Sequence, residues 1–84
     1  MKKTYLKGEI VGRGMFSNEY IFKTKNYFGQ EVEGFFNKCN IVDGKLRVTL
    51  AKDYGDSVSI ITPQYFIGQG NIIEVNKKDI TKHL

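Results

Sequence analysis

Three tight turns constrain the fold of this chain most, because each turn fixes how its flanking strands pair and which residues share a face. The first, Asp43-Gly44, is typical of a two-residue type I′ turn. It predicts a hairpin with Asn40 and Arg47 on its polar face. On the apolar face, Ile41 is expected opposite Leu46, and Cys39 opposite Val48.

Two further turns have three residues and end in glycine, which adopts positive φ without steric cost. They are Tyr27-Phe28-Gly29 and Asp53-Tyr54-Gly55. The expected pairs around the first turn are Thr24 with Val32, Phe22 with Gly34 and Tyr20 with Phe36 on one face, and Lys25 with Glu31 and Lys23 with Glu33 on the other. The expected pairs around the second turn are Leu50 with Val58, Val48 with Ile60, and Lys52 with Asp56.

Period-2 alternation between the turns indicates an all-β chain, because no apolar period of 3.6 residues lasts for two helical turns. The predicted strands cover residues 5–11, 19–25, 30–42, 45–52, 56–62 and 71–75. Inward positions change from even to odd numbers within 30–42, which predicts a β-bulge near Asn37-Lys38. After the last strand, Asn76 is expected to cap one helical turn at 77–79 that places Ile80 against the core. Residues 81–84 are expected to fray.

Residues 44–82 resemble the SH3-like barrels, because two strands joined by a tight turn are followed by "NIIEVNKKDI", a last strand that runs into a one-turn helix and a final apolar residue. The resemblance implies a small antiparallel meander that closes into an SH3-like barrel, with one domain over residues 1–84. An OB-type barrel is the alternative closure. The chain lacks the acidic loop and paired tryptophans of peptide-binding SH3 domains, so the resemblance concerns architecture and not function.

The composition is typical of a soluble globular domain, since 40% of the 84 residues are hydrophobic, 26% are charged and the formal net charge is +4. The single cysteine, Cys39, cannot form an internal disulfide, which favours a reducing compartment. No apolar run approaches the ~20 residues of a membrane span, and no apolar segment of a signal peptide follows the basic start. We therefore expect a cytoplasmic protein with no membrane partner, and the frequent Lys, Asn and Ile residues favour a bacterial source.

The glycines of "EIVGRGMFSNEY" raise the question of a nucleotide-binding loop. Gly12 and Gly14 occupy the first two glycine positions of a kinase-like loop, but the third glycine is missing and Glu19 brings negative charge toward the phosphates. A Rossmann fingerprint would continue into a helix, and a P-loop would need its lysine. These glycines are therefore expected to turn the loop between the first two strands, with Met15 or Phe16 folding over the barrel end.

Catalytic chemistry has little support in the sequence. His83 is the only histidine and lies beside the C-terminus, where no third group can orient it. Cys39 is expected on the apolar face of its hairpin, where a thiol behaves as a small hydrophobe. The acidic residues are spread singly and do not form metal-binding clusters. We therefore expect a protein that is not an enzyme, with no catalytic residue, no cofactor and no metal.

Binding of another protein is the first functional hypothesis. The loop "PQYFIGQG", residues 63–70, carries apolar and aromatic side chains that are costly to expose unless they cover a core or contact a partner. A free sheet edge could also pair with a second copy to form a homodimer, although Pro63 would blunt part of that edge. The candidate protein-binding residues are Met15, Phe16, Tyr65, Phe66 and Ile67.

Weak nucleic-acid binding is the second hypothesis, because small barrels often present basic residues for phosphates and aromatic residues for bases. The candidate residues are Arg13, Lys38, Lys45, Arg47 and Tyr54. Acidic residues interleave with the basic ones along the chain, and the positive charge is small. A protein partner is therefore ranked ahead of nucleic acid.

Overall fold

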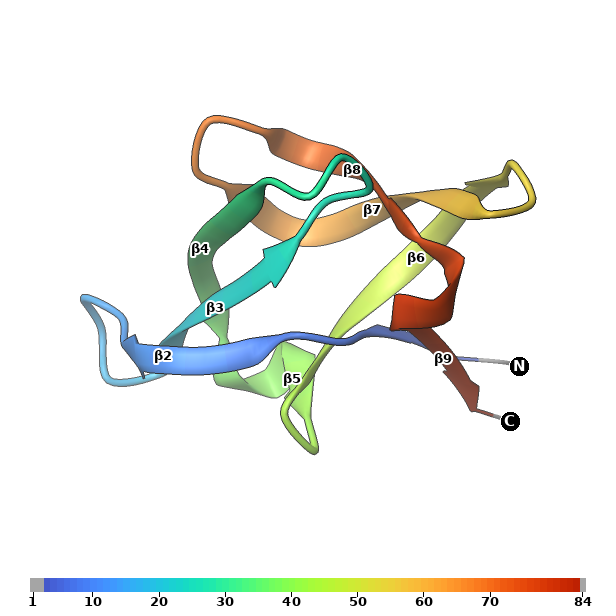
Figure 1. The fold of residues 1–84 in the computed structure, drawn as a ribbon. Coiled ribbons are helices and arrows are strands. Elements are labelled where there is room, and N and C mark those ends of the chain that lie inside the picture. The colour runs from blue at the N-terminus through green and yellow to red at the C-terminus, as the bar shows by residue number, and fades with distance from the viewer. Residues whose placement is uncertain (1–2, 84) are drawn as a thin grey trace.

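The chain folds into antiparallel β-structure in a computed structural model that describes residues 3–83, with the backbone alone for residues 82 and 83 (Figure 1). The elements are β1 Lys3–Leu6, β2 Glu9–Arg13, β3 Glu19–Lys25, β4 Glu31–Asn37, η1 Lys38–Asn40, β5 Ile41–Val42, β6 Lys45–Asp53, β7 Ser57–Phe66, β8 Gly70–Asn76, η2 Lys77–Asp79 and β9 Ile80–His83. Both η elements are single 3₁₀ turns. The predicted all-β class is confirmed.

Two sheets make up the fold. The larger has the strand order β8-β7-β6-β1-β9, with β5 also paired to β6, and it curls into a half-barrel (Figure 1). The smaller has the order β2-β3-β4. All pairs are antiparallel. The architecture is therefore compatible with a small β-barrel.

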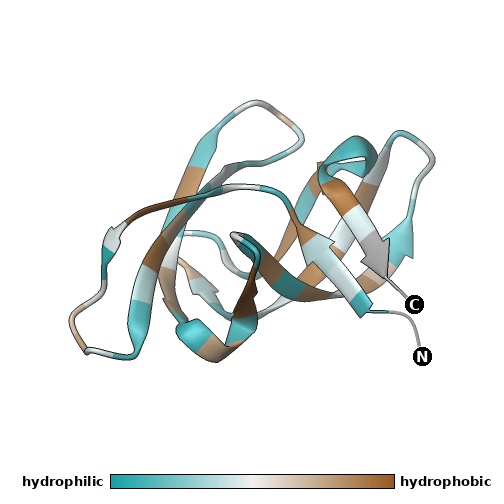
Figure 2. Ribbon diagram, turned by 90° about the horizontal axis from the view of Figure 1, so that it is seen from below, coloured by the Kyte–Doolittle hydropathy of each residue, from teal (hydrophilic) through white to brown (hydrophobic). Residues whose placement is uncertain are grey.

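Apolar and polar residues alternate along the strands (Figure 2), and the inward faces of the two sheets share one core. Three aromatic rings join the sheets: the centroid of Phe36 lies 6.1 Å from that of Phe22 and 5.0 Å from that of Phe66. The core residues are Leu6, Phe22, Val32, Phe36, Leu46, Val48, Val58, Ile60, Phe66, Ile73 and Val75, with Ile41, Leu50 and Ile80 packed against them.

The first predicted strand, residues 5–11, is divided in two at Lys7-Gly8, where the chain passes from one sheet to the other. A Cβ atom at Gly8 would lie 2.5 Å from the ring of Phe22 and 2.6 Å from the carbonyl oxygen of Lys23. The backbone therefore lies directly on β3 at this bend, and only glycine fits. Steric contact between the two sheets, which the alternation pattern does not show, explains the break.

The β3–β4 hairpin confirms the predicted register at every pair, from Tyr20 with Phe36 to Lys25 with Glu31. The turn is anchored by Asn26, which sequence reasoning missed. Its side-chain oxygen accepts hydrogen bonds from the backbone N–H groups of Phe28 at 3.0 Å and Gln30 at 2.9 Å. Asn26 is buried, so its side chain takes the place of water as the hydrogen-bond acceptor for the backbone N–H groups of the turn.

The Asp43-Gly44 turn also has the predicted form, with φ of 53° and 77°, and Ile41 pairs with Leu46. The prediction for Cys39 is wrong. This residue is exposed on the 3₁₀ turn η1, and that turn, rather than a β-bulge near Asn37-Lys38, changes the inward parity. The chain leaves the sheet here, so among the described residues no strand pairs with Val48 on the β5 side of β6, and Thr4 of β1 pairs with it on the other edge.

In the β6–β7 hairpin the predicted register is wrong by two residues: Leu50 pairs with Ile60, not with Val58. The backbone N–H of Gly55 donates to the Asp53 side chain at 2.8 Å, and the register also shifts between Leu50 and Lys52. A side-chain bond and an irregularity therefore lengthen the hairpin end. At Leu50 the error is an even number of residues, so the predicted inward positions of Leu50, Val58 and Ile60 are still correct. Beyond the irregularity, Lys52 pairs with Ser59 and not with Asp56, an error of three residues.

At the C-terminal end, the helical turn at 77–79 and the position of Ile80 against the core are confirmed. Asn76 forms no side-chain capping bond, so its predicted role is wrong. The predicted fraying is also wrong for residues 81–83, because β9 pairs with β1 and adds an edge strand to the larger sheet. Leu84 lies outside the described residues.

Candidate functional site

The predicted loop at residues 63–70 is mostly strand. β7 continues to Phe66, and a turn of three residues leads into β8. Alternation persists along this extension: Tyr65 is 69% exposed, whereas Phe66 is 1% exposed and packs against Phe36. The expectation that Phe66 is exposed is therefore wrong, and this residue belongs to the core. Ile67, in the turn, is 62% exposed.

The outer face of β7 and β8 carries apolar residues that sequence reasoning did not assign to a site. Ile61 and Ile72 lie directly opposite each other, and they are 37% and 58% exposed. Pro63 and Tyr65 follow on the same outward positions of β7. We call Ile61, Pro63, Tyr65 and Ile72 the β7–β8 apolar face. Period-2 alternation could have identified it, because it places Ile61 outward once Ile60 is inward.

The distal half of β7 is held in place by β4 and β8. The backbone N–H of Ile67 donates to the backbone oxygen of Glu33 at 2.8 Å. The backbone N–H of Asn37 donates to the side-chain oxygen of Gln64 at 2.6 Å. The Thr62 hydroxyl donates to the Asn71 oxygen at 3.2 Å. Tyr65 is therefore exposed on an anchored backbone rather than on a free loop, which preorganises the apolar face.

Pro63 lies in an interior strand and not at a free edge, so its predicted role in blunting an edge is wrong. It is tolerated because regular pairing between β7 and β8 is interrupted after Ile61 and resumes at Phe66. Within residues 3–83, no strand pairs with the outer edge of β2, where Ile10 and Val11 are exposed. The homodimer through a sheet edge stays a prediction.

A groove adjoins the apolar face where β6 changes partners. β6 pairs with β5 at Leu46 and with β7 from Thr49, which leaves one side of Arg47 and Val48 between the two partners. The resulting groove has a volume of about 240 Å³. Its lining residues are Asn40, Arg47, Val48, Thr49, Ile61, Thr62 and Pro63. Asn40 and Arg47 thus lie together, as the hairpin prediction implied.

Met15 and Phe16 lie in the loop between β2 and β3, and both side chains are exposed. The expectation that one of them folds over a barrel end is wrong. Figure 1 also places this loop and the β7–β8 turn at separate corners of the molecule. The structure therefore does not combine Met15 and Phe16 with Tyr65 and Ile67 into one patch.

Of the two glycines in this motif, Gly14 has a packing role on the outer face of the smaller sheet. A Cβ atom at Gly14 would lie 2.5 Å from the Cβ of Glu19 and 3.2 Å from the ring of Phe35. At Gly12 the nearest atom would be the Ile21 Cδ1, at 3.6 Å, which is an ordinary van der Waals distance. Gly14 therefore leaves room for side chains of β3 and β4, and packing does not require glycine at position 12.

The predicted basic residues are divided among separate places. Arg13 lies opposite Tyr20 in the β2–β3 pair, and the Lys38 Nζ lies 4.9 Å from the centroid of the Tyr20 ring. Lys45 lines a different depression, together with Tyr5, Val42 and Asp43. Tyr54 is exposed in the β6–β7 turn, where the Lys52 Nζ lies 5.3 Å from its ring centroid. Arg13 and Lys38 thus share Tyr20 as a neighbour, whereas Lys45 and Arg47 lie beside Tyr5 on the larger sheet.

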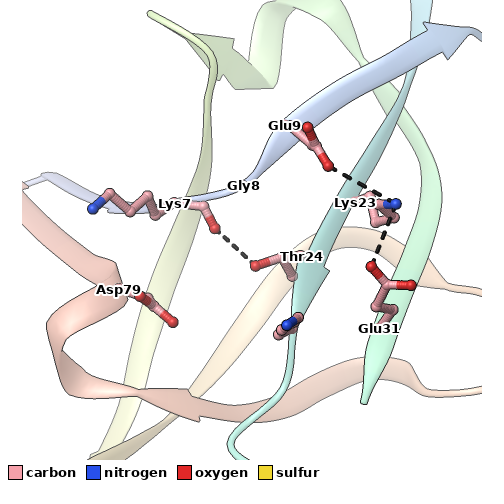
Figure 3. Close-up of a pocket in the computed structure, with 8 residues that line it drawn as sticks. Lys7, Gly8, Glu9, Lys23, Thr24, Glu31 and Asp79 are labelled. Carbon is pink, nitrogen blue, oxygen red and sulfur yellow. Dashed lines mark hydrogen bonds and ion pairs between the residues drawn. The ribbon is translucent and has the colours of Figure 1, made fainter. Parts of the chain in front are cut away.

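A depression of about 430 Å³ lies where β1 passes into β2 (Figure 3). Its charged and polar groups pair with one another: the Lys23 Nζ lies 3.4 Å from Glu31 and 3.8 Å from Glu9, and the Thr24 hydroxyl donates to the Lys7 oxygen at 2.8 Å. The two ion pairs lie within the smaller sheet, and the Thr24 bond ties β3 to the bend between β1 and β2. The depression is therefore best explained as a structural junction.

Two further observations concern metal ligands and membrane-spanning helices. In the part of the chain that the structure describes, no three His, Cys, Asp or Glu side chains group as a metal site would require. Among the same residues, no helix has the length and apolar character to span a membrane.

Comparison of the chain with protein-family models, with curated proteins and with solved structures finds no match. A function for this chain therefore has to be inferred from the geometry and chemistry of the described residues.

Proposed function

We propose that this chain is a non-catalytic protein-binding module that uses the β7–β8 apolar face. The observation that carries the proposal is the pair Ile61 and Ile72, two branched apolar side chains that lie opposite each other and remain exposed. Tyr65 extends the same face on an anchored backbone. An aromatic ring beside aliphatic side chains is typical of the centre of a protein interface.

The energetic reason is the cost of leaving this face in water. Burying an isoleucine side chain contributes ~1.5–3 kcal/mol relative to full exposure, so a covered pair would contribute substantially to association. At the outward positions of residues 61–65 of β7, isoleucine, proline and tyrosine stand where charged residues normally solubilise the outer face of an antiparallel sheet. A contiguous face of this kind favours a macromolecular partner.

We propose further that the sheets close as an SH3-like barrel. The support is that β8 runs into the single 3₁₀ turn η2 and that Ile80 then packs against the core, as the sequence resemblance implied. β9, which the resemblance did not include, continues from Ile80 and pairs with β1. A cytoplasmic location is proposed on the single cysteine alone.

Site-specific photo-crosslinking tests the binding proposal. The photoreactive residue p-benzoylphenylalanine is placed at Tyr65, and in a matched control at Phe28, an exposed aromatic of the β3–β4 turn. After irradiation in cells that express the chain, we expect discrete protein adducts from position 65 and none of the same mass from position 28. Ile61→Ser should remove these adducts. Identical adducts from both positions, or none from position 65, would contradict the proposal.

Nucleic acid is the second candidate, and the observation that favours it is the position of Arg13 and Lys38 beside Tyr20. Cations beside an aromatic ring suit a nucleotide backbone and base. Fluorescence anisotropy with labelled single-stranded and double-stranded oligonucleotides, at about 50 and 200 mM salt, tests it. Binding that weakens steeply with salt, with a smaller slope in Lys38→Ala, would favour this candidate over a protein partner.

A further inference from the structure

The groove where β6 changes its partner from β5 to β7 is continuous with the β7–β8 apolar face, because Ile61 and Pro63 belong to both. Its volume of about 240 Å³ is below the ~300–1,000 Å³ of a small-molecule site. It therefore suits one or two side chains of a larger partner. Asn40, Arg47 and Thr49 supply its polar groups.

Arg47 is the charged residue of this groove, and its guanidinium has no carboxylate partner among the described residues. The lysines that pair with acids, Lys23 and Lys77, lie elsewhere. No aspartate or glutamate lines the groove. A planar guanidinium presents paired donors that match a carboxylate, and the adjacent apolar atoms of Ile61 and Pro63 would partly exclude water from such a pair.

We propose that this groove and the β7–β8 apolar face together bind an extended peptide segment in which an Asp or Glu lies close to apolar residues. The inference rests on the proposed protein-binding function and specifies its partner. Arg47 binds the carboxylate, the amide of Asn40 donates a further hydrogen bond, and Ile61 and Ile72 contact the apolar side chains. A nucleic-acid backbone fits this surface less well, because it needs several cations and the groove has one.

The strand geometry sets the spacing of the binding segment. Thr49 lies opposite Ile61, which lies opposite Ile72, so the site crosses two strand spacings, about 10 Å in all. An extended chain covers ~3.3 Å per residue. Arg47 lies two residues from Thr49 along β6, so the distance from Arg47 to Ile72 is about 12 Å. The acidic residue should therefore lie three to four positions from the apolar residue that contacts Ile72.

Selection from a displayed library of random peptides on the immobilised chain tests the proposal. We expect enriched peptides to contain Asp or Glu at that spacing from a large apolar residue. A synthetic copy of an enriched peptide, measured by fluorescence anisotropy, should bind Arg47→Glu at least tenfold more weakly. A new selection on Arg47→Glu should enrich Lys or Arg in place of the acid. The matched control is Lys78→Glu, which makes the same charge change on η2 and should leave affinity within twofold.

Several outcomes would overturn the inference. Enriched peptides without an acidic residue, or equal weakening by Arg47→Glu and Lys78→Glu, would remove Arg47 from the site while leaving the proposed protein-binding function intact. A selection that enriches nothing would exclude a linear peptide, and crosslinking from Tyr65 would then decide whether a folded protein binds. Loss of oligonucleotide binding in Arg47→Glu, with no enriched peptide, would assign the groove to nucleic acid. Circular dichroism and thermal unfolding confirm that each variant is folded.

Discussion

The two faces of the β7–β8 hairpin carry similarly apolar residues in opposite surroundings. On the inner face, Ile60, Phe66 and Ile73 are buried against the smaller sheet, whereas Ile61, Tyr65 and Ile72 on the outer face are exposed. The difference arises from the position of β4, which covers only the inner face. Residue type therefore does not tell which face is core. The outer face is the exception that needs a functional explanation.

The neighbours Phe66 and Tyr65 should show the largest difference in stability between a substitution on the inner face and one on the outer face. Phe66→Ala removes a fully buried ring that contacts Phe36 and should lower the free energy of unfolding by ~3–5 kcal/mol. Tyr65→Ala should change it by no more than ~0.5 kcal/mol, because the ring is mostly in water. Urea unfolding monitored by circular dichroism measures both. Similar losses in the two variants would mean that Tyr65 also belongs to the core.

The second test concerns the close approach of β4 and β7 that covers the inner face. In Gly34→Ala, the new Cβ would lie 2.6 Å from the Tyr65 oxygen and 3.1 Å from the Phe66 Cα, both backbone atoms. Forcing the strands apart should cost ~1–3 kcal/mol of stability. Gly12→Ala is the matched control, since its nearest atom is 3.6 Å away. A Gly34→Ala variant as stable as the control would show that β7 can move away without loss.

A buried and an exposed threonine test how much side-chain hydrogen bonding contributes to stability on the two faces. Thr62 is buried and its hydroxyl bonds to the backbone oxygens of Gln64 and Asn71, so Thr62→Val should cost ~0.5–1.5 kcal/mol. Thr49 is exposed on the outer side of β6, and Thr49→Val should leave stability nearly unchanged. Thermal unfolding of the pair checks this difference. An equal effect at both positions would mean that the Thr62 bonds do not anchor the irregular part of β7.

The smallest expected effect on stability is at Ile72. Ile72→Ser should alter the free energy of unfolding by less than ~0.5 kcal/mol, yet it should remove the crosslinked adducts formed from Tyr65. Ile72→Val keeps a branched apolar side chain and should retain them. Adduct yield and urea midpoint, measured on the same variants, separate binding from folding. A stable Ile72→Ser variant that keeps all adducts would exclude Ile72 from the interface.

Prediction from the sequence succeeded where pairing depends on local turn chemistry. Tyr27-Phe28-Gly29 and Asp43-Gly44 give the observed registers, because each turn is satisfied by its own backbone and neighbouring side chains. The β6–β7 register was missed because the Asp53 side chain and a pairing irregularity change the length of the hairpin end. Cys39 was misplaced because the chain leaves the sheet at η1, and the same edge of β6 is taken from Thr49 onward by β7.

The candidate site shows the same division. The hairpin pattern correctly places Arg47 outward and close to Asn40, since the side-chain period of a strand is a local property. Tyr65 was expected in a loop, and its exposed position comes from the extension of β7. The burial of Phe66, the exposure of Ile61 and Ile72, and the groove at Arg47 depend on where β4 crosses β7 and where β6 changes partners. Those positions follow from packing between strands distant in sequence, where a single glycine, Gly34, lets two backbones meet. Local chemistry thus specifies the strands and their two faces, and only tertiary packing selects the face that remains exposed.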